Sequence, residues 1–113
     1  MSKYEVFTDY HLSAKVFVIE TEFGGRKGPI FDDYRGQFFW HINGETCTDW
    51  DARYFFEGGQ VAPGESAMCK IVVSNNLLKY SDGNFLEGAQ FGIREGVRVV
   101  AVGVINSSKV PNA

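Results

Sequence analysis

The residues of this chain that could contact phosphate are concentrated in one glycine-rich basic stretch, residues 24 to 40, which reads GGRKGPIFDDYRGQFFW. A phosphate-binding P-loop requires the pattern GxxxxGK[ST], because its backbone amides, its lysine and its hydroxyl contact different parts of the phosphate. This stretch lacks the Gly-Lys-Ser/Thr ending and is not followed by a helix pattern, and Pro29 has no amide hydrogen to donate. The sequence therefore predicts that this chain by itself binds no nucleotide and carries no GTPase or ATPase activity.

Other residue types that could do chemistry are present without the spacing that chemistry needs. His11 and His41 are far apart, and no serine lies in a GxSxG elbow. Cys47 and Cys69 form no CxxC motif, so two free, partly buried thiols are expected rather than a disulfide, a metal site or a nucleophile. Four aspartates read as solvated turns rather than as a cation site: Asp32, Asp33, Asp49 and Asp51. We expect no catalytic residue, no metal and no cofactor.

Length and charge restrict the class of protein further. A chain of 113 residues with 44% hydrophobic residues has the material for one domain with one modest core. A formal net charge of −3 argues against binding nucleic acid by bulk charge, although it permits a local basic patch. The N-terminal residues MSKYEVFTDYH have no signal-peptide pattern, and no apolar run approaches a membrane span, so we expect a cytoplasmic protein with no membrane contact.

The elements that must position these residues are predicted to be strands. Four segments show the period of two, or the density of valine, that is typical of strands: Ser13–Phe23, Gln37–Ile42, Ala67–Val73 and Val97–Ile105. No window keeps a helical pattern over three turns, and glycine-containing turns separate the segments. An antiparallel barrel or sandwich is therefore predicted, with a tail that frays from Ser107.

Three phrases in the chain resemble, in order and spacing, the C-terminal β-barrel domain of elongation factor Tu. They are GGRKGPIFDDYRGQFFW, APGESAMCKIVVS and FGIREGVRVVAVGVI, and the resemblance covers about residues 15 to 105. It implies an all-β fold, a closed six-stranded antiparallel barrel, as a single domain over residues 1–113. The GTP-binding domain and the second barrel of the factor are not represented, so the chain is similar to the third domain standing alone.

The resemblance also implies a binding role and a set of residues for it. In the family this barrel contacts the T-stem backbone of aminoacyl-tRNA and meets the nucleotide-exchange factor and the GTPase domain. Arginine, amide and hydroxyl donors suit backbone contacts that do not read sequence. The positions carried over to RNA or partner binding are Arg26, Arg35, Gln37, Thr46, Glu95, Gly96 and Arg98. Asn75 occupies a position that is basic in the family, which weakens the RNA reading.

Two regions depart from the family pattern and are expected to be enlarged loops at the barrel ends, near residues 47–62 and 77–90. The first is rich in aromatic residues. Exposed on such a loop, Trp50, Tyr54 and Phe55 would form a contact surface for another protein.

Each candidate residue also has a structural interpretation. Arg26 and Arg35 would then pair with Asp32 and Asp33, and a second set would hold the last hairpin in register: Arg94, Glu95 and Arg98. Four aromatic residues would belong to the barrel core: Tyr34, Phe38, Phe39 and Trp40. Three glycines would serve only to supply a positive φ: Gly24, Gly25 and Gly96. For Thr46 the structural interpretation is favoured.

Three hypotheses of function follow. The first is a module that docks on tRNA or another structured RNA through its backbone, with binding that weakens as salt rises. The second is a protein-interaction module, with a translation-related partner, that uses the aromatic loop. The third and least favoured is a small enzyme, which would require a deep polar pocket with a perturbed carboxylate or cysteine.

Overall fold

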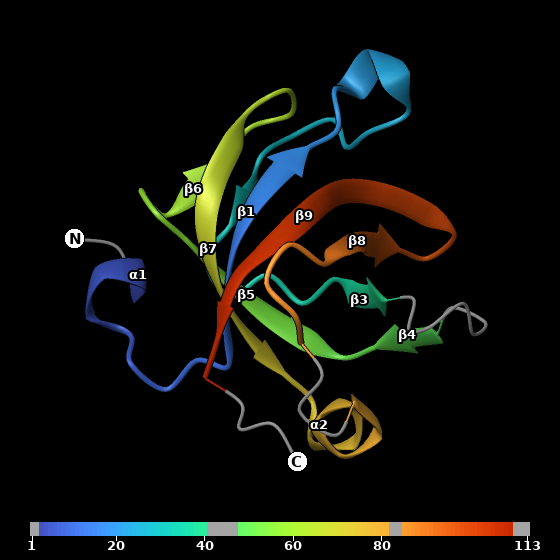
Figure 1. Ribbon diagram of the computed structural model, residues 1–113. Helices are drawn as coiled ribbons and strands as arrows, with labels where there is room; N and C mark the ends of the chain where they lie inside the picture. The colour runs from blue at the N-terminus through green and yellow to red at the C-terminus, as the bar shows by residue number, and fades with distance from the viewer. Residues whose placement is uncertain (1–2, 41–47, 82–84, 110–113) are drawn as a thin grey trace.

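One curled antiparallel sheet forms most of the molecule (Figure 1). The computed structural model describes residues 3–40, 48–81 and 85–109. The helical elements of these ranges are short: α1 (Lys3–Val6), the 3-10 turn η1 (Thr21–Phe23) and α2 (Asn75–Ser81). The strands are β1 (Leu12–Val18), β2 (Ile30–Phe31), β3 (Gln37–Trp40), β4 (Thr48–Trp50), β5 (Ala52–Phe56), β6 (Gln60–Val61), β7 (Ser66–Val73), β8 (Gln90–Glu95) and β9 (Arg98–Ser108). The all-β prediction is confirmed.

The main sheet has seven strands in the order β4-β3-β8-β9-β1-β7-β5, and β2 and β6 form a separate pair. The prediction of a closed six-stranded barrel is wrong, because no ladder in the described residues joins the two edge strands β4 and β5. These strands are successive segments of one run, separated by Asp51 alone. A single residue leaves no room for a hairpin turn, so β4 and β5 cannot pair with each other, and the sheet curls into a barrel-like shape without a closing ladder.

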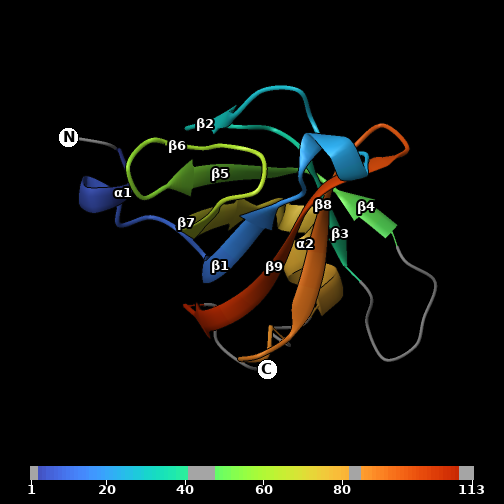
Figure 2. The same cartoon turned by 90° about the horizontal axis from the view of Figure 1, so that it is seen from above.

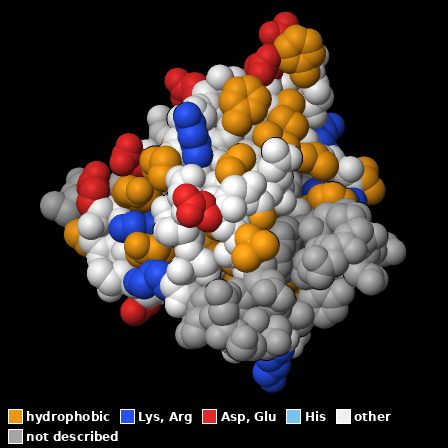
Figure 3. Space-filling view, in the orientation of Figure 1, with side chains coloured by type: hydrophobic (Ala, Val, Ile, Leu, Met, Phe, Trp, Pro, Cys, Tyr) orange, Lys and Arg blue, Asp and Glu red, His pale blue; other side chains and the backbone are white. Residues whose placement is uncertain are grey.

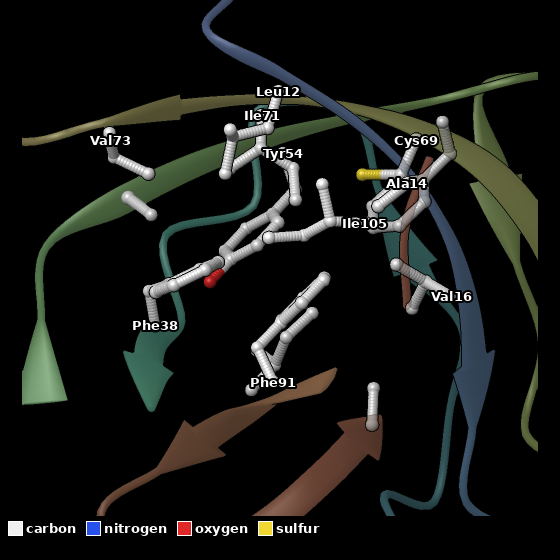
Figure 4. Packing of buried hydrophobic residues seen from close by; sticks show 14 of the residues in the cluster. Leu12, Ala14, Val16, Phe38, Tyr54, Cys69, Ile71, Val73, Phe91 and Ile105 are labelled. Carbon is white, nitrogen blue, oxygen red and sulfur yellow. The ribbon is translucent and has the colours of Figure 1, made fainter. Parts of the chain in front are cut away.

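The interior of the curl is filled by alternate residues of the strands. In β1, Leu12, Ala14, Val16 and Val18 are fully buried. Figure 4 shows most of these side chains converging with residues of β3, β5, β7 and β8 on one cluster. The strand predicted over Ser13–Phe23 is confirmed only as far as Val18, because the chain then turns through η1 to Gly24, whose φ is 93°.

The region predicted as an enlarged loop near residues 47–62 contains β4, β5 and β6, so that prediction is wrong for the described residues from Thr48 onward. The physical reason is alternation: Ala52, Tyr54 and Phe56 face the core while the residues between them face outward. In the second region, α2 replaces the expected loop through Ser81. The Ser74 hydroxyl accepts a hydrogen bond of 3.2 Å from the Leu77 amide, which caps the helix, and Leu77 is buried.

The two ends of the described chain pack against the sheet. The segment from Tyr4 to Tyr10, which includes most of α1, lies beside β5 and β7 (Figure 2). At the other end, β9 continues to Ser108, and the Lys109 amide donates to the His11 carbonyl at 2.8 Å. The prediction that the tail frays from Ser107 is therefore wrong for Ser107 and Ser108. Within the described ranges, no helix has the length and apolar character needed to cross a membrane.

Candidate RNA- and partner-binding surface

The first group of predicted site residues lies around the ring of Tyr34, which is only half-buried and packs against the core. Arg26 Nε lies 2.7 Å from Glu95 Oε2, and the Tyr34 hydroxyl donates to the same carboxylate oxygen. The Arg26 guanidinium also lies 5.5 Å from the centre of the Tyr34 ring, and its Nη1 donates to the Pro29 carbonyl at 2.5 Å. Most of the bonding capacity of Arg26 is thus used within the protein.

The protonation state of Tyr34 follows from this geometry. Burial, the hydrogen bond to Glu95 and the charge of that carboxylate together raise the pKa of Tyr34 well above its ordinary value of 10.0. The hydroxyl therefore stays protonated at neutral pH and donates to Glu95. It is suited to holding the loop and not to acting as a base.

The second group of charged residues gathers on Asp33, whose φ of 61° turns the chain sharply before β3. Arg53 contacts both carboxylate oxygens, with Nε 2.7 Å from Oδ1 and Nη2 3.1 Å from Oδ2. Arg35 contacts the same two oxygens at 3.2 and 3.5 Å. The hydrogen bonds from Arg53, and then those from Arg35, lower the pKa of Asp33 from 3.8 to about 2, against the opposing effect of burial.

Arg53 was not predicted as a site residue. Its signal in the sequence is its place in the alternation ARYFF, where it falls between inward-facing residues and so faces outward. Only the pairing of β5 with the segment around Tyr34, through an isolated bridge between Tyr34 and Tyr54, brings it to Asp33. The guanidinium of Arg35 remains the more accessible of the two, with 67% of its side chain exposed against 42% for Arg53.

The remaining predicted residues lie at the edge of this surface. Gln37 donates from Nε2 to Asp51 Oδ1 at 3.3 Å, so a carboxylate lies beside this amide. Gly96 lies in the exposed turn between β8 and β9 and has a φ of 61°, and Arg98 is the exposed first residue of β9. Thr46 falls outside the described residues.

Several structural interpretations are confirmed. Arg35 pairs with Asp33, whereas Arg26 pairs with Glu95 at the end of β8 rather than with an aspartate of its own loop. Positive φ is confirmed for Gly24 and Gly96. It does not account for Gly25, where an added Cβ would lie 2.0 Å from the Ile19 carbonyl oxygen, so close backbone approach excludes a side chain there.

The predicted exposed aromatic loop is wrong. Tyr54 is fully buried and Phe55 is 3% exposed, since both belong to β5. Tyr54 faces the core, and the outward-facing Phe55 is covered by Phe7, whose ring centre lies 4.6 Å away. Trp50, half-buried in β4, packs against the core.

The enzyme hypothesis named two kinds of group, a perturbed carboxylate and a cysteine, and the described residues contain one example of each. Burial raises the pKa of the Cys69 thiol, which keeps it protonated and unreactive. The perturbed carboxylate, Asp33, is shifted toward the charged form by arginines, opposite to the shift of a general acid. No group of three or more potential ligands that could hold a metal ion occurs in the part of the chain that is described.

The model of the family described as elongation factor Tu C-terminal domain matches residues 6–109, nearly the whole chain.

Proposed function

Because the chain belongs to the elongation factor Tu C-terminal domain family, we propose that it is a non-catalytic, translation-factor-like binding module that docks on the backbone of structured RNA. The contact surface, here called the arginine surface, consists of Arg26, Arg35, Arg53, Asp33 and Glu95. A tRNA is the proposed RNA, because it is the ligand that the family resemblance implies, and the place of action would then be the cytoplasm.

The observation that supports this proposal is the state of Arg35. Three guanidinium groups share two carboxylates on the arginine surface, which leaves an excess of one positive charge. Arg35 holds Asp33 through the longer contacts and is the most exposed of the three. Its planar fork can therefore rotate toward a phosphate while Arg53 continues to neutralise Asp33.

The same geometry limits the strength of binding. A surface with few free guanidinium groups makes few phosphate contacts and releases few counterions. Each phosphate contact adds about 0.9 to the steepness with which the logarithm of affinity falls against the logarithm of salt concentration. With about two contacts, affinity should fall roughly tenfold between about 50 mM and about 200 mM salt. Gln37 would contribute little, because Asp51 accepts its amide and would repel a phosphate.

The test is binding of labelled tRNA over a salt series by three proteins: the unaltered chain, Arg35→Gln and Lys15→Gln. Arg35→Gln removes the exposed guanidinium but leaves the Arg26–Glu95 and Arg53–Asp33 pairs in place. Lys15→Gln is the matched control, since it removes one exposed positive charge from the outer face of β1. We expect the arginine variant alone to lose affinity and to show a shallower salt slope.

Two results would contradict the proposal. One is no detectable binding even at low salt. The other is an equal loss of affinity in the lysine variant, which would mean that tRNA responds to total charge and not to the arginine surface.

A further inference from the structure

A second surface, separate from the arginine surface, lies on the outer face of the sheet. It is a groove of about 990 Å³ over β1, β9, β8 and β3. Its apolar lining is formed mainly by Phe17, Phe39, Val99, Val102 and Val104. Figure 3 looks at this side of the molecule and shows hydrophobic side chains over β1 and β9.

The lining leaves several large apolar side chains partly open to solvent. Val102 is 45% exposed and Val104 is 39% exposed, and Phe17 and Phe39 are half-buried in the same groove. A contiguous apolar surface with polar residues at its margin is typical of a contact site for another molecule. The groove is therefore a candidate for docking.

The backbone of this face excludes one mode of docking. β8 is paired with β3 and β9, β9 with β8 and β1, and β1 with β9 and β7. A partner strand would find no free ladder of amides and carbonyls on these three strands, so strand addition does not fit. Recognition must use side chains alone, as when the apolar stripe of an amphipathic helix lies in a groove.

The charge of the groove defines the partner further. Among the described residues that line it, Lys15 is the one with a charged side chain, and none of the ion pairs formed by those parts of the chain involves it. In a groove-to-groove dimer, the second copy would present another lysine and no lining carboxylate, so Lys15 would find no opposite charge there. A carboxylate on the partner would satisfy the ammonium group.

On the other half of the outer face, the N-terminal segment of the chain itself packs against the sheet. Over β5 and β7, the N-terminal segment places the Phe7 ring on Phe55, and Lys70 lies 4.5 Å from the centre of the Tyr4 ring. Lys70 Nζ also donates to the Phe7 carbonyl at 3.1 Å. An aromatic segment anchored by an outward-facing lysine thus covers one half. The groove likewise combines apolar side chains with an outward-facing lysine, and no described segment of the chain covers it.

We propose that the groove binds an amphipathic helix of a partner protein, whose apolar stripe packs on Phe17, Val102 and Val104 and whose acidic side chain pairs with Lys15. This protein-binding site is independent of the RNA proposal, since it shares no residue with the arginine surface.

The test uses a fluorescein-labelled synthetic peptide of about 16 residues, roughly four helical turns. It carries leucines at helical spacing and one glutamate at the edge of the leucine stripe, and a matched peptide carries lysine in place of the glutamate. Both are titrated against the unaltered chain, Lys15→Glu and the double variant Val102→Thr/Val104→Thr. Threonine keeps the β-branched shape of valine, so the double variant retains β9 while its groove becomes polar.

We expect the glutamate peptide to bind the unaltered chain about threefold more tightly than the lysine peptide, and Lys15→Glu to reverse that order. The valine double variant should lose about tenfold in affinity for both peptides. Amide shifts in a ¹⁵N spectrum should be confined to β1, β8, β9 and β3, and Arg35→Gln should bind as the unaltered chain does.

Three results would overturn the proposal. The first is no binding of the glutamate peptide, and the second is binding that the valine double variant leaves unchanged. The third is a dimer of the unaltered chain, seen by size-exclusion light scattering and abolished in the double variant, which would make a second copy the occupant.

Discussion

At the scale of single residues, two tyrosines with neighbouring rings have opposite hydroxyl environments. The ring centres of Tyr34 and Tyr54 lie 5.9 Å apart. The Tyr34 hydroxyl reaches the surface and donates to Glu95. The Tyr54 hydroxyl is buried in the core without a hydrogen-bond partner among the described atoms. Figure 4 shows its oxygen beside Phe38 in the interior of the curled sheet.

We therefore expect the same substitution to have opposite signs at these two positions. Tyr54→Phe removes a buried hydroxyl that has lost its water without gaining a partner, and should raise the free energy of unfolding by about 1 kcal/mol. Tyr34→Phe removes a hydrogen bond to a carboxylate and should lower it by about 1 kcal/mol. Urea unfolding at neutral pH measures both. A destabilised Tyr54→Phe would show that the hydroxyl has a partner in solution, such as a buried water.

His11 provides a prediction about pH. Its Nδ1 accepts a hydrogen bond of 3.1 Å from the Val73 amide, so protonation of that nitrogen breaks the bond. Burial, and then the charge of Lys109, lower the pKa of His11 below 6.5. The unfolded chain therefore binds the proton more readily than the folded protein does. Stability from this site is complete above pH 6.5 and is lost as the pH falls below that value.

The measurement is the urea midpoint between about pH 7.5 and about pH 5, the range in which histidine titrates. The unaltered chain should lose stability across this range. His11→Asn should show a smaller loss, since an asparagine carbonyl can accept the Val73 amide without titrating. Equal slopes for the two proteins would mean that His11 does not control this part of the pH profile.

At the scale of elements, the pairing of β8 with β9 depends on one glycine. Phe91 and Gly103 are directly opposite each other in the ladder. A Cβ at Gly103 would lie 2.3 Å from the Phe91 ring, closer than packed atoms allow. The ring of Phe91 also stacks on Phe38 at 4.7 Å and is held in the core, so it cannot move aside easily. Gly103 is thus required by packing, although its φ is ordinary.

Gly92, on the partner strand, gives a matched comparison. Its added Cβ would meet neighbours no closer than 3.6 Å, which is ordinary contact. Gly103→Ala should lower the free energy of unfolding by about 1–3 kcal/mol through overpacking. Gly92→Ala should be neutral or slightly stabilising, because alanine restricts the unfolded chain more than glycine does. Chemical denaturation of both variants tests the register that places Gly103 opposite Phe91. Equal changes in the free energy of unfolding for the two variants would contradict that register.

At the scale of the whole molecule, two lysines fasten the N-terminal segment to the sheet. Lys70 from β7 lies 5.0 Å from the centre of the Tyr10 ring, and Lys109, just beyond β9, lies 4.2 Å from it. Lys109 Nζ also donates to the Thr8 carbonyl at 2.5 Å. The segment is held by contacts to parts of the chain that are distant in sequence.

We expect Lys70→Met to loosen this segment without unfolding the sheet. The substitution keeps an apolar chain of similar length but loses the hydrogen bonds to backbone carbonyls and the cation–π contacts, so amide exchange over residues 4–10 should quicken by about tenfold. Exchange in β1 and β9 should stay unchanged. Lys79→Met, an exposed lysine of α2, is the control and should change neither region. Faster exchange throughout the sheet would mean that the segment is part of the cooperative core.

The sequence alone determined the features that depend on local pattern. Period-two alternation predicted strands that share the core, because successive side chains point to opposite faces of a sheet. The missing Gly-Lys-Ser/Thr ending excluded a P-loop, because that chemistry depends on residues adjacent in the chain. The three phrases gave the family, which the match over residues 6–109 confirms.

The tertiary structure decided everything that depends on which strands meet. It placed Arg53 on Asp33 and Arg26 on Glu95, and these partners are remote in sequence and joined only through strand pairing. It also moved Tyr54 and Phe55 from a predicted loop into β5, since burial depends on what covers a side chain and not on its type. The groove over β1, β9, β8 and β3 could not be predicted from the sequence either, because its lining residues come from several separate segments of the chain.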